Sequence, residues 1–582
     1  MSSTVETWVV TFAILCLALF TGYLLYSYSD PSNAWTYTGA VYVSWLLGFC
    51  GVILLPLDIA YAKRVDVENN PLLGYWIFVF WSTFFLAWII DPLLQSYHDN
   101  GSYHAKARII GAIKENICYY AGVVALVVAV FLLILFLNPD NPPDIDTFVE
   151  VLVDLGTVYG MLFIVVLLGY GLVAAPRSLW QRSDSNKCLR RLHFTCQEIE
   201  NEYQDSKFEL EAIIKAVKMA EEKAHERDDI ELKAFIADVI AKCPLHVLDG
   251  MDNHRARTNE HKLQIVDMKT FAALHAKLLR ALRLYKSTND NWQQTLQYAD
   301  ELEALVAGQV PAYATVGSST GRMYWWWRLN CSKVTYKSTA VLCSIFSLAI
   351  IWGEITILFV DNENGWVLSV YGMIVHVTSG GVGTLLATFL PLFYMAYCMF
   401  YTMFGVKFLK YYKLTARATD ASGLLFNAYY LCRLQFSLGY HFLLVLDYAA
   451  VEGNKKAGAE NHGKMHTALQ KVVGNMSSIG WFNRYSPIVL ITLSLATAFN
   501  WHAKVLGWIG VDVFKDPQDG NAEHNERIEE GVRMLKRERE KRNRRSSRYA
   551  QGSPFVQAGL AMSPRKSTPI NGIRGKSPYN KV

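Results

Sequence analysis

Nine stretches of this chain are almost free of charged residues, and each is long enough to cross a lipid bilayer as a helix. A crossing takes roughly 20 apolar residues, and the stretches lie at about residues 8–26, 36–61, 73–96, 113–137, 148–175, 336–360, 383–409, 421–447 and 487–509. Inside lipid a segment must satisfy its own backbone N–H and C=O groups, and a helix does so. The sequence therefore predicts an all-α polytopic membrane protein with nine transmembrane helices, grouped as five plus four.

Composition excludes the main soluble classes of protein. Of the 582 residues, 52% are hydrophobic and only 18% are charged, which is too apolar for a soluble chain of this length. The ten cysteines form no Cys-x-x-Cys pair, and most lie inside apolar runs, where a thiol behaves as a small hydrophobic group. We therefore expect neither a soluble enzyme nor a secreted disulfide framework, and we predict no cofactor and no metal site.

One polar stretch separates the two groups of apolar runs. It divides the chain into a first membrane half (1–176), a soluble domain (177–335), a second membrane half (336–510) and a basic tail (511–582). From residue 515 onward the tail holds 16 Lys and Arg against 8 Asp and Glu. Because basic residues collect on the cytosolic side of membrane proteins, we expect the soluble domain and the tail in the cytosol and the N-terminus outside, in the plasma membrane or an endomembrane.

Two apolar stripes in the soluble domain repeat at helical spacings among charged residues. The first consists of Cys196, Ile199, Tyr203, Leu210, Ile214 and Val217. The second consists of Phe271, Leu274, Leu278, Ala281, Tyr285, Trp292, Leu296 and Ala299. Such stripes are typical of helices with one buried face. They predict two long antiparallel helices that pack as a coiled-coil hairpin and offer a surface to protein partners.

Residues 366–405 are nearly uncharged but too long for one helix, and a Gly-rich segment at 379–383 interrupts them. The part before the interruption would be about 20 Å long as a helix, which is short for a crossing. We therefore expect the segment 366–382 to be re-entrant or interfacial and to lead into a span kinked at Pro391. In the alternative, a tenth span, the basic tail would lie outside.

The tail is expected to begin with a charged helix from Arg527 to about Arg545 and to be disordered after it. Basic clusters beside a membrane attract anionic lipids, and phosphates would weaken that attraction. The candidate phosphorylation sites are Ser553, Ser563, Thr568 and Ser577. In the alternative, the tail only aids solubility and fixes topology. The one Asn-x-Ser/Thr site expected outside, Asn475, is the candidate glycosylation site.

Two ionisable residues lie deep inside predicted spans, where such groups are costly and mark pathways, internal pairs or ligand sites. Counted from the cytosolic ends of their spans at 1.5 Å per residue, Glu354 is about 27 Å deep and Arg433 about 18 Å deep. A long arginine side chain, helix tilt or one water could bridge the difference. We predict a Glu354–Arg433 interaction that locks two helices together, and a ligand or ion site is the alternative.

The remaining intramembrane ionisable residues are Asp58, Asp91, His441 and Asp447. The three aspartates lie near span ends, where a carboxylate can reach lipid headgroups, so a structural role is favoured for each. His441 has no metal-ligand partner at helical spacing. The sequence GGVGT at 380–384 lacks the Lys-Ser/Thr that completes a phosphate-binding loop. We therefore predict no catalytic residues.

Several segments resemble a known family. They are residues 54–61, 95–103, 113–122, 169–180, 341–354, 406–434 and 528–545, of which 341–354 and 406–434 are the most specific. On these segments the chain resembles the LMBR-like (limb region membrane protein) family and looks closest to the branch called LMBR domain-containing protein two. The resemblance implies nine spans, an outside N-terminus, a cytosolic C-terminus and a role in regulating a G-protein-coupled receptor.

One departure from the family pattern affects the eighth span. The family has Cys-Arg-Leu-Thr-Pro-Pro at this place, whereas residues 432–437 of this chain are Cys-Arg-Leu-Gln-Phe-Ser and contain no proline. Since proline kinks a helix, we expect the eighth span to be straight here.

These features favour a non-enzymatic receptor or adaptor that regulates receptor signalling or membrane-protein trafficking. It is expected to lie in the membrane and to bind proteins, receptors among them, through the coiled coil. The tail is expected to bind anionic lipids, and no nucleic-acid partner is expected. The alternative is a small-solute or ion transporter, or an escort, that uses Glu354 and Arg433.

Overall fold

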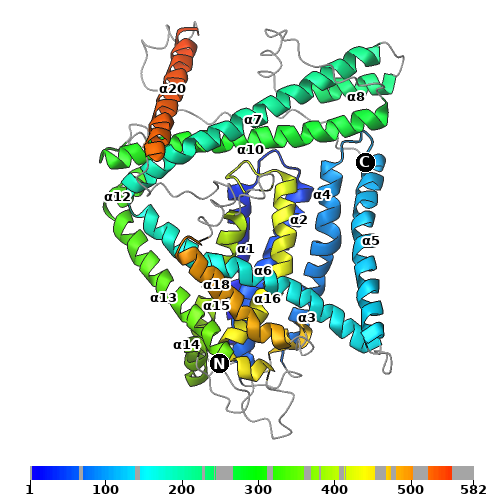
Figure 1. The fold of residues 1–582 in the computed structure, drawn as a ribbon, viewed down its shortest axis with the longest axis vertical. Coiled ribbons are helices and arrows are strands. Elements are labelled where there is room, and N and C mark those ends of the chain that lie inside the picture. The colour runs from blue at the N-terminus through cyan, green and yellow to red at the C-terminus, as the bar shows by residue number, and fades with distance from the viewer. Residues whose placement is uncertain are drawn as a thin grey trace.

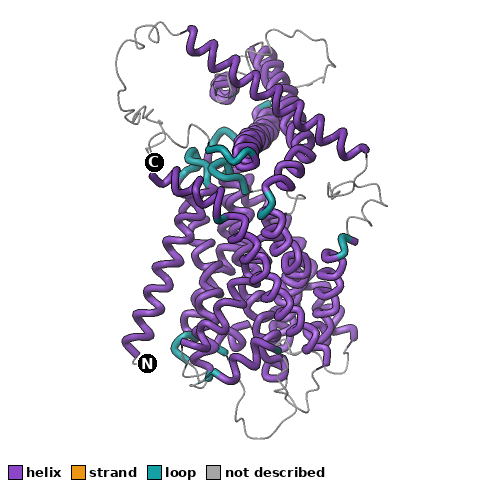
Figure 2. The backbone as a smooth tube through the Cα atoms, turned by 90° about the vertical axis from the view of Figure 1, so that its left-hand side faces the viewer, coloured by secondary structure: helices purple, strands orange, loops and turns teal. Residues whose placement is uncertain are grey.

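The computed structural model describes residues 3–63, 70–137, 145–225, 230–241, 243, 267–310, 319–359, 369–378, 382–405, 412, 414–452, 467–473, 480–501 and 522–552. Across these ranges the chain is helical, and its one β-type pairing is a single parallel bridge between Ser29 and Thr419. The helices form an upright bundle, and a long helical hairpin lies across one end of it (Figure 1). The N-terminal end of the first helix lies at the opposite end of the bundle (Figure 2).

The first half of the bundle precedes the hairpin. Its elements are α1 (Ser3–Tyr28), α2 (Trp35–Ala62), α3 (Leu73–Phe85), the π-helical turn η2 (Leu86–Ile90), α4 (Asp91–Asp99), α5 (Ala105–Leu137) and α6 (Ile145–Arg182). The π-helical turn ends two residues before Pro92, which has no N–H for the carbonyl four residues earlier. That carbonyl belongs to Trp88, and the hydroxyl of Tyr120 donates to it instead.

The second half of the bundle follows the hairpin. Its elements are α12 (Ser319–Asn330), α13 (Ser332–Phe359), α14 (Val370–Val377), α15 (Val382–Gly405), α16 (Ala421–Glu452), α17 (Ala468–Val473) and α18 (Gly480–Ala498). The helix α16, which lacks the two prolines of the family pattern, is uninterrupted from Ala421 to Glu452. Pro391 lies inside α15, which continues through it.

Seven of the helices in the described residues are long and apolar enough to cross a membrane. They are Thr11–Tyr28, Trp35–Ala62, Leu73–Asp99, Ala105–Leu133, Val158–Arg182, Ser332–Phe359 and Val382–Gly405. The chain is therefore an all-helical, multi-pass membrane protein. The two other predicted spans correspond to α16 and to α18, which begins at Gly480, before the predicted start at 487, and ends at Ala498.

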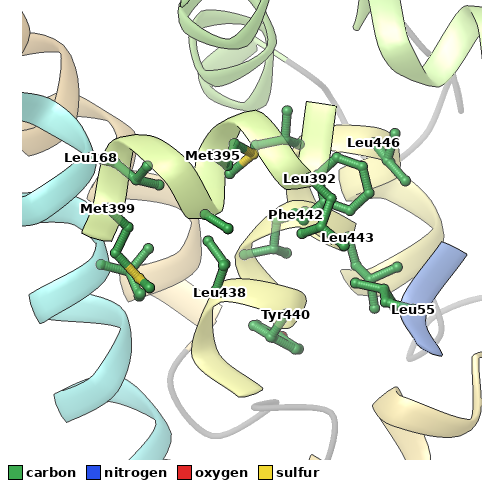
Figure 3. Close-up of a cluster of buried hydrophobic side chains, with 14 of the residues drawn as sticks. Leu55, Leu168, Leu392, Met395, Met399, Leu438, Tyr440, Phe442, Leu443 and Leu446 are labelled. Atoms are coloured by element: carbon green, nitrogen blue, oxygen red, sulfur yellow. The ribbon is translucent and has the colours of Figure 1, made fainter. Parts of the chain in front are cut away.

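The helix α16 differs from the seven because protein, rather than lipid, surrounds it. Every residue from 421 to 446 is buried except Tyr429, Tyr430 and Arg433, which are half-buried. In the main core, leucines of α16 pack against Leu55 of α2 and against α15, as Figure 3 shows. A helix enclosed in this way can carry polar residues, and this lowers its hydropathy below that of a lipid-facing span.

Part of the segment 366–382 forms the short helix α14. Ser369 begins it by accepting a hydrogen bond from the backbone N–H of Gly372 at 3.5 Å. Residues 366–368 and 379–381 lie outside the described residues. The expectation that this segment is re-entrant or interfacial stays a prediction.

The hairpin consists of α7 (Ser185–His225) and α10 (Met268–Val306), which run antiparallel, and the shorter α8 (Ile230–Ala241), which packs beside them (Figure 1). Its buried core contains Leu210, Ile214 and Val217 of the first predicted stripe and Phe271 and Leu278 of the second. The stripes therefore identify the packed faces correctly. The helix α8, which the stripes did not predict, completes this core with Leu232, Phe235, Ile236 and Val239.

The last described helix is α20 (Ala522–Gly552), which extends beyond both ends of the predicted charged helix. It crosses the hairpin rather than running along it (Figures 1 and 2). The candidate phosphorylation sites Ser553, Ser563, Thr568 and Ser577 lie outside the described residues.

Candidate functional site

A pair of ionisable side chains lies in the interior of the bundle. Glu354 of α13 and His441 of α16 are almost completely buried, and Glu354 Oε1 lies 2.7 Å from His441 Nε2. A carboxylate and an imidazole at this distance share a proton or form an ion pair, depending on protonation.

The structure does not bring Glu354 and Arg433 together, so the predicted partner is corrected to His441. The reason is depth along α16. At 1.5 Å per residue His441 lies roughly 30 Å from the start of α16, which matches the depth of about 27 Å for Glu354, whereas Arg433 lies about 12 Å short of His441. The two sites on α16 are therefore separate.

Arg433 occupies a second site, beside η2 and α4. Its guanidinium lies 4.0 Å from the ring centre of Trp88 and 5.0 Å from that of Tyr429, and it donates to the carbonyl oxygen of Ala87 at 3.0 Å. The positive charge of Arg433 also interacts electrostatically with Asp91. The Asp91 carboxylate accepts a hydrogen bond from the Ser44 hydroxyl at 2.9 Å. Cation–π contacts with Trp88 and Tyr429 and the Ala87 carbonyl of the π-helical turn thus hold the arginine.

Two of the aspartates expected near lipid headgroups are instead fully buried inside the protein. Asp91 lies in the site just described. Asp58 accepts hydrogen bonds from the backbone N–H groups of Ala468 and Leu469, at 3.0 and 2.9 Å, and from Asn70 Nδ2 at 2.7 Å. It therefore fastens the beginning of α17 to the end of α2. The headgroup interpretation of both residues is wrong, because each carboxylate has internal donors.

Two predicted sites cannot be placed in this arrangement. Asp447 lies in α16, but its side chain is outside the described residues, and so is the candidate glycosylation site Asn475.

A charged junction joins the hairpin to the bundle. Arg283 of α10 pairs with Asp99, the last residue of α4, and with Asp420, the residue before α16, the latter at 3.2 Å. Asp420 also lies 3.1 Å from His98 Nε2, and the Ser422 hydroxyl donates to Asp99 at 3.1 Å. One arginine of the hairpin therefore connects two separate elements of the bundle.

Further contacts on the same helix reinforce the junction. Lys286, one turn after Arg283, pairs with Asp30 between α1 and α2. His275, two turns before Arg283, lies with Nδ1 2.7 Å from the carbonyl oxygen of Gly101. The α10 helix is thus attached along three of its turns.

A cavity of about 240 Å³ opens beside the junction. It is lined by Asp99, Arg280, Arg283, Leu284, Ser287, Tyr412, Ala418, Thr419, Asp420, Ser422 and Gly423. Charges of both signs line it, so it favours neither a cation nor an anion.

The junction perturbs the pKa of its acidic groups. Burial raises the pKa of Asp420, but the hydrogen bond and charge of His98 and the charge of Arg283 outweigh burial and lower this pKa to about 2. At Asp30, burial likewise opposes the hydrogen bonds from Lys286 and Ser32, and the net pKa is lowered. Both carboxylates are therefore ionised at neutral pH.

The charged junction was not predicted from the sequence, although two of its residues lie in segments that resemble the family. Asp99 and Asp420 lie inside two of the segments that carry the family resemblance, 95–103 and 406–434. Arg283 lies outside the second apolar stripe, on the polar face of the helix that carries it, where a charged residue is expected to be solvated. Only the packing of the hairpin on the bundle shows that these three residues meet.

Similarity to known proteins agrees with this architecture. A family model described as LMBR1-like membrane protein matches residues 6–502. The chain is 25% identical to the human "G-protein coupled receptor-associated protein LMBRD2", over 91% of this chain and 83% of the human protein. It is 25% identical to the Gallus gallus protein of the same name, over 87% of this chain and 79% of the relative.

A more distant relative is the Drosophila melanogaster "LMBR1 domain-containing protein 2 homolog", 22% identical over 94% of this chain and 85% of the relative. No solved structure matches the chain. Because the family model covers most of the sequence, the protein belongs to the LMBR1-like membrane protein family.

Proposed function

We propose that this protein is a receptor-associated adaptor of the membrane, which holds its helical hairpin against the cytosolic end of the bundle and uses the hairpin to bind protein partners. The observation that carries the proposal is the charged junction, which attaches α10 to the bundle through Arg283 and Lys286. A hairpin attached on one side keeps its other surfaces available. Relatives named as G-protein coupled receptor-associated proteins support receptors as the partner class.

Proximity labelling in living cells tests this proposal. A labelling enzyme is fused to the C-terminus, and neighbours are compared between the wild type and Leu210→Asp/Leu278→Asp, which places two carboxylates in the hairpin core. Both leucines are no more than 1% exposed, so the hairpin core should not form. We expect receptors or trafficking proteins among the neighbours of the wild type and their loss from those of the variant.

The matched control places the same substitutions on the exposed faces of the same helices, as Ala212→Asp/Ala273→Asp. It should keep the neighbours of the wild type. If the core variant reaches the membrane in normal amount and its neighbours do not change, the adaptor proposal is wrong.

The Glu354–His441 pair supports a second candidate function, the transport of an ion or small solute through the bundle. Buried ionisable pairs inside membrane helices are common on such pathways. Purified protein in liposomes loaded with a pH-sensitive dye would test it. Transport predicts a proton flux that Glu354→Gln abolishes, and equal dye responses in protein-containing and empty liposomes would argue against it.

A further inference from the structure

The helix α20 packs against α7 and α10 at the end of the hairpin nearest α12 (Figure 1). The surface that it contacts, called here the α20 groove, is formed by Cys196 of α7 and by Trp292, Leu296, Ala299, Asp300 and Glu303 of α10. Its floor is apolar, and its two carboxylates lie at one side.

Four residues of α20 enter or line this groove from one face of the helix. Gly531 lies so close to α7 that an added Cβ would be 2.0 Å from the backbone carbonyl oxygen of His193. Leu535 is 1% exposed and packs among the apolar residues of the groove. Arg539 lies 2.7 Å from both Asp300 and Glu303, and Arg542 lies 3.7 Å from Asp300. The spacing of four, four and three residues is that of one helical face.

The contact is suited to reversible binding. Among the described side chains of α20, Leu535 alone belongs to the apolar cluster of the groove, and the ion pairs of Arg539 are about one-third exposed on both sides. Ion pairs with this exposure contribute little to binding because water screens them. The opposite face of α20 is solvated, with exposed Arg533, Lys536, Arg537 and Lys541.

The hairpin does not need α20 for its own core. The main hairpin core, around Leu210, Leu278 and Phe235, is a separate cluster from the groove that contains Trp292. Release of α20 would therefore leave the main hairpin core packed and would uncover part of the apolar cluster that contains Trp292. A tryptophan in a groove beside acidic residues resembles the centre of a protein-binding surface.

We propose that the α20 groove is the partner-binding surface of this protein, that it takes a basic amphipathic helix from a protein partner, and that α20 occupies it as an internal ligand. The contacts of α20 define what fits: a small residue, a leucine four positions later, and arginines eight and eleven positions after the small residue. An apolar anchor fills the floor at Trp292, and arginines pair with Asp300 and Glu303. This is the helix-in-groove mode of recognition.

The inference rests on the proposed adaptor function and names the surface and the partner chemistry. It is tested with the purified full-length protein and a fluorescent peptide of residues 522–545. Two full-length variants release α20 by different routes: Leu535→Asp/Arg539→Glu removes the anchor and a charge pair, and Gly531→Leu inserts a side chain against the carbonyl of His193.

We expect both released variants to bind the peptide about tenfold or more tightly than the wild type, in which the tethered α20 competes at high effective concentration. A peptide with Leu535→Asp/Arg539→Glu should not bind. Adding Asp300→Arg/Glu303→Arg to the released protein should abolish binding of the normal peptide, and a peptide with Arg539→Glu/Arg542→Glu should restore it.

A second peptide, with an unrelated sequence but the same four residues at the same spacing, tests whether the groove accepts a partner. It should bind the released variants, and a scrambled peptide of equal composition should not. If only the native α20 sequence binds, α20 is a structural clasp and the proposal fails. It also fails if the released variants gain binding to phosphatidylserine vesicles but to neither peptide, since the basic face of α20 then serves lipid.

The outcomes separate this inference from the proposed function. If the peptides bind as expected but the neighbours in living cells do not depend on the hairpin, the groove exists and the adaptor proposal is wrong. If the neighbours depend on the hairpin but neither peptide binds, the adaptor proposal stands and the groove is not its binding surface.

Discussion

At the scale of the residue, Arg283 of the hairpin connects two separate elements of the bundle. It is the cation shared by Asp99 and Asp420, and its side chain is 22% exposed. Without it, two carboxylates from different elements would face each other across a partly dehydrated contact. Like charges in such a contact repel, so the hairpin would be held less firmly.

We therefore predict that Arg283→Ala destabilises the protein by roughly 1.5–3 kcal/mol, the usual contribution of hydrogen bonds to charged groups. Thermal unfolding of the purified protein measures the change. Arg280→Ala is the matched control, because Arg280 lines the same cavity on the same helix but is exposed. Equal unfolding temperatures for the two variants would contradict the role assigned to Arg283.

The same junction predicts a dependence on pH. The pKa of Asp420 is about 2 in the folded protein, below the ordinary value of about 3.9 for an aspartate. The depressed pKa stabilises the fold above pH of about 4, and the stabilisation is lost as the pH falls toward 2. Unfolding temperatures should thus decline on this acid limb, and Asp420→Asn should lessen the decline. An unchanged slope in that variant would show that other groups cause it.

The buried pair predicts an energetic coupling between Glu354 and His441. The sequence had instead predicted a coupling between Glu354 and Arg433. Removing one member of a buried ion pair costs about 3–5 kcal/mol, whereas replacing both by apolar residues is often neutral. Glu354→Leu and His441→Leu should each destabilise the protein, and the double variant should recover much of the loss. Glu354→Leu and Arg433→Leu should instead be additive within about 0.5 kcal/mol, because their sites are separate. Unfolding measurements on these variants decide between the two partners.

At the scale of the element, the sequence predicts most helices correctly because hydropathy and helical periodicity are local signals. The buried stripes of α7 and α10 are examples, since residues such as Leu210 and Leu278 repeat at the spacing of a packed face. The features that the sequence could not predict depend on which helices pack against one another. The position of α16 at the centre of the bundle, the addition of α8 to the hairpin and the pairing of Glu354 with His441 each require knowing which helices touch.

Close packing between α6 and α15 yields a further prediction. A Cβ at Gly171 of α6 would lie 2.4 Å from the backbone carbonyl oxygen of Cys398 of α15, so Gly171→Ala must move one helix. Overpacking of this kind costs about 1–3 kcal/mol. Gly156→Ala on the same helix is the matched control, because nothing lies within 4 Å of its added Cβ. We expect the first variant to unfold at a lower temperature and the second to unfold at or above the temperature of the wild type, since alanine favours helix.

At the scale of the whole molecule, the contacts at the two ends of α16 show how the chain passes through the bundle. Asp420, just before α16, pairs with Arg283 of the hairpin. The helix α17, which follows α16, is bound by Asp58 near the end of α2 that lies away from the hairpin. α16 therefore runs from one end of the bundle to the other. If α18 then crosses back to the hairpin end of the bundle, α20 reaches the hairpin without a further crossing of the membrane.

This path predicts a topology that epitope tags can test. With nine crossings, tags before Trp8 and between residues 453 and 466 lie outside, and a tag after residue 552 lies in the cytosol with the hairpin. If only the seven most apolar helices crossed, the tag between 453 and 466 would lie on the hairpin side instead. Antibody staining of intact and permeabilised cells distinguishes the two outcomes, with a tag inside residues 251–262, between α8 and α10 in the sequence, as the cytosolic control. Staining of the 453–466 tag only after permeabilisation, in cells where the N-terminal tag stains intact, would rule out α16 as a crossing, because its two ends would then face the same compartment.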